Sequence, residues 1–353
     1  MRVLSGVQPS GNLHIGNYFG AIRQFLRLQE EHECFYFLAD LHALTTVQDP
    51  DRFRGLVRDL ATGFLALGLD PSRSVIYRQS DLPEVTELSW YLSTVTSMGL
   101  LQRCHSFKDK VAQGVVPSHG LFAYPVLMAA DILIVKSDLV PVGKDQKQHL
   151  EVTRDVATSF HAVYDSEIFV LPEPLILDEV AVVPGVDGRK MSKSYDNTID
   201  IFGPEKPIRK KIMSIVTDST PVEDPKPTED NALHDLLKLF APDDSERSWV
   251  ETAFSEGGVG YGDMKKRLFD YYLATFGDAR ARYDELKNDP AEVERILAAG
   301  AETARETAAP LMADVRRVIS RWRLTAVPRF ACRVETGASQ STIPMNNVPG
   351  NDR

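Results

Sequence analysis

The sequence predicts an α/β fold in which a doubly wound parallel sheet carries a smaller, all-helical C-terminal domain. Two observations support this prediction. In the first half of the chain, short apolar runs alternate with stretches whose apolar residues recur at helical spacing. Beyond about residue 200 the short runs cease, and helical spacing alone continues as far as residue 323.

The predicted strands are the short apolar runs at residues 3–7, 34–38, 75–78 and 139–142. Between them, helical periodicity begins at Ile15, covers residues 53–67, where Gly68 suits a C-terminal cap, and returns at 83–98. Parallel strands place their carboxyl ends along one edge, where such sheets bind ligands. The segments that follow three of these strands are 8–17, 39–45 and 143–149.

The second half is predicted to be helical. Its periodic stretches are 205–216, 231–240, 245–255, 262–276, 278–287, 290–308 and 309–323. A Pro-rich, charged connector at 221–227 separates the first two stretches. From residue 327 to residue 353 periodicity vanishes and Gly, Pro, Ser, Asn and Thr dominate, which predicts a mobile tail.

Composition restricts the class of protein. Of the 353 residues, 43% are hydrophobic and 25% charged, as in soluble globular proteins. Residues 1–8 lack the apolar core of a signal peptide, and the apolar stretch 121–135 is too short to span a membrane and contains Asp131. The three cysteines are far apart in the sequence, so we expect no structural metal site and a reducing cytoplasm.

The formal net charge of -10 is unfavourable for a protein that binds nucleic acid, because phosphate contacts need Lys and Arg. Local basic clusters at 209–211, 265–267 and 316–317, the last followed by Arg321 and Arg323, are nonetheless candidates for such contacts. A solvated helix face explains each cluster equally well.

The first candidate site is QPSGNLHIGN at residues 8–17, between the first predicted strand and the first helix. A helix N-terminus presents free N–H groups and partial positive charge, so phosphate is favoured there. Gly16 would let a flat purine lie against the backbone, and His14 and Asn17 add side-chain donors. A plain strand–helix joint of similar composition is the alternative interpretation.

The second candidate site is KMSKS at residues 190–194, preceded by Gly185 and Gly188 and followed by Asp196 and Asn197. Two lysines and two hydroxyls on a glycine-flanked loop suit a pyrophosphate group that develops negative charge. The alternative interpretation is a solvated basic loop.

A third candidate site is formed by Tyr124, Met128 and Asp131, whose spacing places them on one face of a helix that includes, or begins at, Pro125. Together these side chains would form an apolar slot with a hydrogen-bond acceptor at its floor. A core helix with a paired aspartate is the alternative interpretation.

The His-Ile-Gly turn at 14–16, followed by KMSKS at 190–194, resembles the class I aminoacyl-tRNA synthetases. Asn17 stands where the class has a second His, and this variant occurs in the tryptophanyl branch. Further segments that resemble this branch, in the same order, are 40–45, 124–132 and 140–149. The chain is thus similar to the bacterial-type tryptophanyl-tRNA synthetases over all but residues 327–353.

This resemblance implies a Rossmann catalytic domain, a mobile loop, a helical domain on the tRNA side and a homodimer. The corresponding ranges are 1–189 for the catalytic domain, 190–200 for the KMSKS loop and 201–289 for the helical domain, with helices at 290–325 packing near the catalytic domain. It also implies a cytoplasmic enzyme that activates L-tryptophan with ATP and transfers it to tRNA(Trp). Mg²⁺ would enter with ATP as a substrate complex.

Taken position by position, the resemblance assigns ATP binding to both motifs and to the segment after the fourth predicted strand. The implied ATP-binding residues are Gln8, Pro9, Ser10, Gly16, Asn17, Gly143, Lys144, Asp145, Val182, Lys190, Met191, Ser192, Lys193 and Ser194. Lys193 is the principal catalytic candidate, with Lys190, His14 and Asn17 as further ones. Many relatives have Glu at the position of Lys144.

The implied tryptophan-binding residues are Asp131, Tyr124, Met128, Gln146, His42 and Val142. An indole N–H is only a donor, so a buried indole needs an acceptor, and this role falls to Asp131. Leu4 stands where several relatives have Phe, so the pocket wall differs there. Lys108 and Lys110 match a basic loop that approaches the phosphates in relatives, although an exposed turn is the alternative.

Three other functions fit parts of the sequence. A tyrosyl-tRNA synthetase could also use Asp131, because a phenol is a donor too. A paralogue that binds tryptophan or its adenylate without charging tRNA fits the acidic net charge, but not the intact KMSKS sequence. A small nucleotidyltransferase shares the His-Ile-Gly turn, but such chains are usually shorter and lack the helical half.

Overall fold

The computed structural model describes residues 1–104, 118–143, 147–176 and 182–325. Some predicted features lie outside these ranges: the basic pair Lys108 and Lys110, the site residues at 144–146 and the tail at 327–353. In the described part of the chain, no helix combines the length and the apolar composition that a membrane crossing requires.

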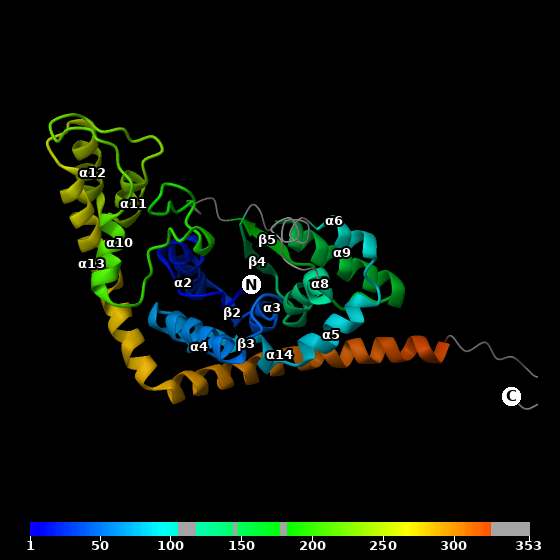
Figure 1. Cartoon of the computed structure of the whole chain (residues 1–353). Helices are drawn as coiled ribbons and strands as arrows, with labels where there is room; N and C mark the ends of the chain where they lie inside the picture. Colours follow the sequence, from blue (N-terminus) through cyan, green and yellow to red (C-terminus); the bar gives the residue numbers. More distant parts are fainter. Residues whose placement is uncertain (105–117, 144–146, 177–181, 326–353) are drawn as a thin grey trace, which may run out of the picture.

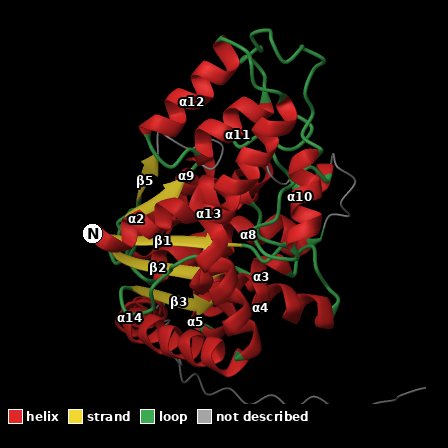
Figure 2. Cartoon of the chain, turned by 90° about the vertical axis from the view of Figure 1, so that its left-hand side faces the viewer, coloured by secondary structure: helices red, strands yellow, loops and turns green. Residues whose placement is uncertain are grey.

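A parallel sheet of five strands, in the order β3-β2-β1-β4-β5, lies at the centre of the first half (Figure 2). Its strands are β1 Arg2–Val7, β2 Glu33–Leu38, β3 Ser74–Arg78, β4 Leu139–Val142 and β5 Glu173–Ile176. The four predicted strands and the fold class are confirmed. The fifth, β5, was not predicted, because its sequence EPLI combines a charged residue with Pro174, which an edge strand tolerates.

Strand order reverses at β1, because β2 and β4 pair with its two sides. Val3 lies opposite both Cys34 on β2 and Leu139 on β4. In doubly wound sheets, the crevice outside the carboxyl ends of the strands at this reversal receives ligands. The residues that follow β1, from Gln8 onward, therefore open into that crevice.

Helices of the first half cover both faces of the sheet (Figure 1). They are α1 Ile15–Asn17, the π-helical turn η1 Tyr18–Ile22, α2 Arg23–Glu31, α3 Asp40–Ala43, α4 Pro50–Ala66, the 3₁₀ turn η2 Gln79–Asp81, α5 Glu84–Ser93, α6 Met98–Arg103, α8 His119–Ile134 and α9 Lys147–Tyr164. The side chain of Val3 joins a cluster with α2 and α4, and that of Leu4 joins one with α5, α8 and α9. Alternation along β1 thus divides the core into two layers.

The structure corrects one predicted helix and decides between two alternatives for another. The predicted helix at 83–98 is two helices, because the hydroxyls of Thr94 and Thr96 bond to carbonyls of the preceding turn and Ser97 caps α6 through the Leu100 N–H. For the helix that carries Tyr124, Met128 and Asp131, the alternative that includes Pro125 is confirmed, because α8 begins after the Ser118 cap and Pro125 lies inside it.

The second half contains a 3₁₀ turn and helices that stack beside the sheet (Figure 1). They are η4 Lys193–Tyr195, α10 Glu205–Met213, α11 Ala232–Phe240, α12 Asp244–Ser255, α13 Tyr261–Asn288 and α14 Pro290–Thr325. Four predicted stretches merge into α13 and α14, so the predicted breaks near Gly277 and Pro310 were wrong. Packing against the rest of the molecule outweighs the local cost of these two residues.

Helix α14 returns from the helical half to the edge of the sheet and runs along β3 (Figures 1 and 2). At Gly300 the contact is so close that a Cβ atom would lie 2.0 Å from the carbonyl oxygen of Ile76. Only glycine permits this approach of the helix to the strand backbone. Helix α14 therefore packs directly on the sheet as part of the same hydrophobic core.

We expect Gly300→Ala to destabilise the chain by about 1–3 kcal/mol, because the added methyl group must displace α14 from β3. Gly277→Ala is the matched control in the neighbouring helix, where nothing lies within 4 Å of the new Cβ, and should stabilise by about 0.5–1 kcal/mol. Urea unfolding measures both changes. A Gly300→Ala chain as stable as the wild type would contradict the close contact.

Candidate active site

Two adjoining cavities lie at the reversal of strand order. The first, of 620 Å³, lies between the end of β1, the start of α1 and the KMSKS loop (190–200). The second, of 380 Å³, lies between β1, β4, α3 and α8. Both are lined by Ser5, Gly6, Gln8, Pro141 and Val142. A ligand in one cavity can thus meet a ligand in the other across this shared wall.

The two motifs that are distant in the sequence meet through backbone hydrogen bonds. The Ile15 N–H donates to the Ile199 carbonyl at 2.9 Å, and the Ile201 N–H donates to the Leu13 carbonyl at 3.0 Å. His14 is the N-cap residue of α1, and its backbone N–H donates to the Asn17 side-chain oxygen at 3.0 Å. The first helix turn and the end of the KMSKS loop are therefore fixed against each other.

Most predicted nucleotide-site residues line the first cavity. They are Gln8, Ser10, His14, Gly16, Asn17, Gly143, Val182, Lys190, Met191, Ser192 and Lys193. Pro9, which is buried, and Ser194, which is exposed, are absent from its lining. Lys144 and Asp145 lie outside the described residues. Gln24, one helical turn beyond Gly20 on the same lining face, was not predicted, because nothing but its place on α2 distinguishes it.

Lysine and histidine give this cavity its electrostatic character. The Lys193 ammonium lies 3.3 Å from the Ser10 hydroxyl. Desolvation by the surrounding protein lowers the pKa of Lys193. Burial, with a smaller contribution from Lys193, lowers the pKa of His14 to about 4, so its imidazole is neutral at pH 7. The His14 Nδ1 is buried without a hydrogen-bond partner. Such a cavity favours an anion that brings its own hydrogen-bonding groups.

The second cavity has a buried carboxylate at its floor. Asp131, which is 2% exposed, accepts hydrogen bonds from Gln79 Nε2 at 2.7 and 2.9 Å and lies 2.9 Å from His42 Nε2. Burial raises the pKa of Asp131, while His42 and Gln79 oppose that rise. Asp131 thus lines the cavity and also has hydrogen-bond partners within the chain. Both predicted alternatives, an acceptor at the floor of a slot and a paired aspartate on a core helix, describe it.

The walls of the second cavity are largely apolar and aromatic. Predicted members are Tyr124, Met128, His42 and Val142, and Leu4 joins them. The Tyr124 ring lies edge-on to His42, with ring centroids 6.1 Å apart. Gly6 makes room for the Phe37 ring, because a Cβ at residue 6 would lie 2.3 Å from it. Gln146 lies outside the described residues.

Neither Gln79 nor His149 was among the predicted site residues, although His149 ends the predicted segment 140–149. The Gln79 side chain is fully buried, and its oxygen accepts from the Leu41 N–H at 3.1 Å while its nitrogen binds Asp131. Gln79 directly follows β3, so applying the rule of strand ends to every predicted strand would have found it. His149 lines the second cavity on α9, and its ring meets Tyr124 edge-on.

His14 should make stability depend on pH. Because its pKa is about 4 in the folded chain and 6.5 without burial, the unfolded chain binds more protons between these values. The contribution is complete above pH 6.5 and is lost as the pH falls toward 4. The free energy of unfolding, measured with urea, should therefore fall less in His14→Gln than in the wild type when the pH is lowered from 7 to 5. Equal losses in both chains would count against the buried, neutral histidine.

Comparison with known proteins agrees with this geometry. Residues 1–277 match the family described as tRNA synthetases class I (W and Y). The tryptophan–tRNA ligases of Rhodopirellula baltica and Fusobacterium nucleatum are 55% and 49% identical to the chain, over 90% of it and over 98% and 97% of those relatives. A crystal structure of the Campylobacter jejuni tryptophanyl-tRNA synthetase with ADP and tryptophan is 51% identical, with a TM-score of 0.86 over 91% of this chain and 100% of that one. The chain therefore belongs to the class I tRNA synthetases, in the tryptophanyl-tRNA synthetase family of bacterial type.

Proposed function

We propose that the chain activates L-tryptophan with ATP in the two adjoining cavities and then transfers the tryptophanyl group to tRNA(Trp). Membership of the family makes it a ligase of the aminoacyl-tRNA synthetase type. The observation that carries the assignment of the cavities is their shared wall, with lysines on one side and a buried carboxylate on the other. The relative from Campylobacter jejuni, with ADP and tryptophan bound, supports it.

In this proposal ATP occupies the first cavity, and Mg²⁺ enters with it as part of the substrate. Gly16 leaves room for the adenine, and the phosphates face the start of α1 and the two loop lysines. The tryptophan carboxylate attacks the α-phosphate, and pyrophosphate departs. Lys190 and Lys193 stabilise the charge that develops on the leaving group, so catalysis consists of positioning and electrostatic stabilisation.

Tryptophan occupies the second cavity in the same proposal. Asp131 keeps acceptor capacity beyond its contacts with Gln79 and His42, because a carboxylate offers about four lone-pair sites. The indole N–H donates to this oxygen, while Tyr124 and Met128 surround the ring. The tryptophan carboxylate and the ATP α-phosphate then meet at the wall that the two cavities share.

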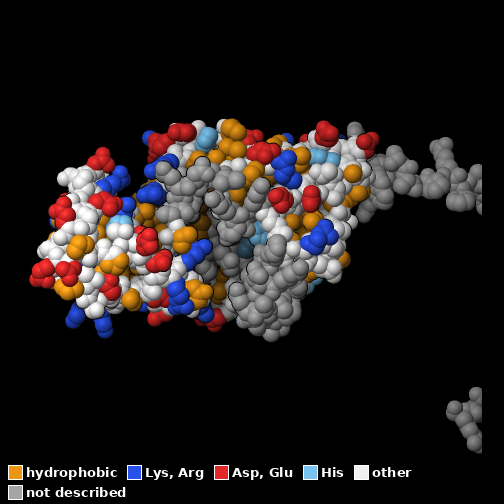
Figure 3. All heavy atoms as spheres, turned by 90° about the horizontal axis from the view of Figure 1, so that it is seen from above, with side chains coloured by type: hydrophobic (Ala, Val, Ile, Leu, Met, Phe, Trp, Pro, Cys, Tyr) orange, Lys and Arg blue, Asp and Glu red, His pale blue; other side chains and the backbone are white. Residues whose placement is uncertain are grey.

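The proposal extends to the partner molecules. Most basic clusters considered for tRNA are paired within the chain: Lys266 with Asp263, Arg267 with Glu246, Arg316 with Glu87 and Arg317 with Asp314. On the face drawn in Figure 3, acidic and basic side chains lie interspersed. We therefore assign tRNA contacts to no single basic cluster. The proposal keeps the division into a catalytic domain at 1–189 and a helical domain on the tRNA side at 201–289.

We also propose a cytoplasmic homodimer. Its support is the pair of large apolar side chains Trp90 on α5 and Met98 on α6, which are 70% and 63% exposed. Trp and Met side chains are enriched in protein–protein interfaces relative to the rest of the protein surface.

ATP–pyrophosphate exchange with each amino acid, followed by tRNA charging, tests the proposed function. Exchange with tryptophan is expected. Exchange with tyrosine instead would make the chain a tyrosyl enzyme, and exchange without charging would make it a paralogue that does not load tRNA. Identity of 49–55% to tryptophan–tRNA ligases, over nine-tenths of the chain, favours the first outcome.

Lys193→Ala should lower the single-turnover rate of adenylate formation by about 10²–10³-fold, because it removes a charge that acts in the transition state. The tryptophan dissociation constant, measured by calorimetry, should stay unchanged, since Lys193 lines only the first cavity. Lys206→Ala, on an exposed lysine of α10, is the control. A wild-type rate in Lys193→Ala would remove Lys193 from the mechanism.

Asp131→Ala should weaken tryptophan binding by about 1–3 kcal/mol, because the indole N–H and Gln79 both lose their acceptor. Calorimetric titration with tryptophan measures the loss. ADP binding to the same variant is the internal control and should be preserved, since Asp131 does not line the first cavity. Wild-type tryptophan affinity in this variant would exclude the proposed acceptor.

A further inference from the structure

The KMSKS loop follows a tight hairpin that positions its lysines. The Met191 N–H donates to the Val183 carbonyl at 2.9 Å, and the Gly185 N–H donates to the Arg189 carbonyl at 2.7 Å. Gly188 has a φ of +84°, which favours glycine at the turn. The chain then passes through η4 and returns to the base of this hairpin at Asn197, whose side chain is 1% exposed.

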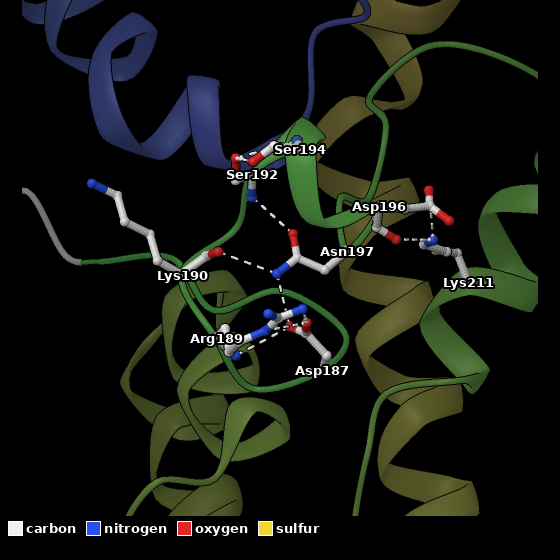
Figure 4. A network of polar contacts seen from close by, with 8 residues as sticks. All are labelled: Asp187, Arg189, Lys190, Ser192, Ser194, Asp196, Asn197 and Lys211. Atoms are coloured by element: carbon white, nitrogen blue, oxygen red, sulfur yellow. Dashed lines mark hydrogen bonds and ion pairs between the residues drawn. The ribbon is translucent and has the colours of Figure 1, made fainter. Parts of the chain in front are cut away.

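The Asn197 amide bonds to the backbone on both sides of Met191 (Figure 4). Its Nδ2 donates to the Lys190 carbonyl at 3.1 Å, and its Oδ1 accepts from the Ser192 N–H at 2.8 Å. A residue of a neighbouring parallel strand makes this same pair of bonds, so the side chain takes the place of a missing strand. Ser192 accordingly has extended dihedrals, φ −154° and ψ 139°.

This extended backbone sets the directions of the side chains. Alternation places Met191 on the opposite side from Lys190 and Ser192, and Met191 is buried at 6% exposure. The Lys190 side chain points away from the polar network (Figure 4) and lines the first cavity. Ser192 in turn lies 2.9 Å from the Ser194 hydroxyl across the turn that carries Lys193.

The surroundings fix Asn197 closely. A Cβ atom at Gly185 would lie 2.2 Å from the Asn197 Nδ2, and the Val186 N–H donates to the Asn197 carbonyl at 3.0 Å. The same Nδ2 also donates to Asp187 at 2.7 Å. Only an amide of this length supplies a donor and an acceptor at these places, since a carboxylate lacks the donor.

We infer that Asn197 is a positioning residue for adenylate formation: its amide fixes the backbone at 190–192 and thereby directs Lys190 and Lys193 toward the departing pyrophosphate. This inference rests on the proposed function. Asn197 is absent from the lining of both cavities, so it acts through the lysines and not by contact with substrate. Its loss should therefore lower the rate of the chemical step more than the affinity for either substrate.

Asn197→Ala tests this in the full chain. Single-turnover adenylate formation should fall by about 100-fold, as expected when reacting groups shift by about 1 Å, while the tryptophan dissociation constant stays within twofold of the wild type. Arg189→Ala is the matched control, because it removes another Asp187 partner of the same loop without touching the backbone at 190–192 and should keep the wild-type rate. A rate within twofold of the wild type in Asn197→Ala, or an equal loss of tryptophan affinity, would overturn the inference.

A double variant, Asn197→Asp with Asp187→Asn, isolates the bond to Lys190. The carboxylate introduced by Asn197→Asp still accepts from the Ser192 N–H, and the amide introduced by Asp187→Asn can donate to it, so the donor to the Lys190 carbonyl is lost. The ion pair of Arg189 with Asp187 is lost as well, and Arg189→Ala measures that loss separately. A rate that stays well below the wild type supports the inference, and a wild-type rate overturns it. If the wild-type chain itself fails to exchange pyrophosphate with tryptophan, the proposed function fails instead, and the two failures are thereby distinguished.

Discussion

The active site depends on the pairing of residues 13–15 with residues 199–201. Backbone hydrogen bonds join Ile15 to Ile199 and Ile201 to Leu13, and they bring the first helix turn and the KMSKS loop to one cavity. Helix α13 supports this junction, because the Tyr272 hydroxyl and the Arg280 guanidinium donate to the Ile201 carbonyl at 2.6 and 2.8 Å. Hydrogen bonds therefore join the helical half of the chain to the segment that ends the KMSKS loop.

Two buried amides organise the charged side chains of the two cavities. Gln79 binds both oxygens of Asp131 and accepts from the backbone of α3, which carries His42. Asn197 bonds to the backbone on both sides of Met191 and sets the direction of Lys190. An amide suits both places, because it donates and accepts at once without adding a charge to a site whose charges act on substrate. Neither Gln79 nor Asn197 is among the described residues that line the two cavities.

Local electrostatics matter here more than the net charge of -10. Because His14 is neutral at pH 7, Lys190 and Lys193 are the charged side chains among the described residues that line the first cavity. At the second cavity, burial raises the pKa of Asp131, and the hydrogen bonds from His42 and Gln79 oppose that rise. The surroundings thus lower the pKa of His14 and act in both directions on the pKa of Asp131.

The sequence by itself determined β1 to β4, the alternation with helices and many of the residues that line the cavities, because apolar periodicity and short motifs are local properties. Tertiary structure decided what depends on distant partners. Helices α13 and α14 continue through Gly277 and Pro310 because packing outweighs local propensity, and β5 forms because β4 offers it an edge. The hydrogen bonds of Asp131 with His42 and Gln79, and those of Asn197, likewise depend on the tertiary structure, since each joins residues whose proximity exists only in the folded chain.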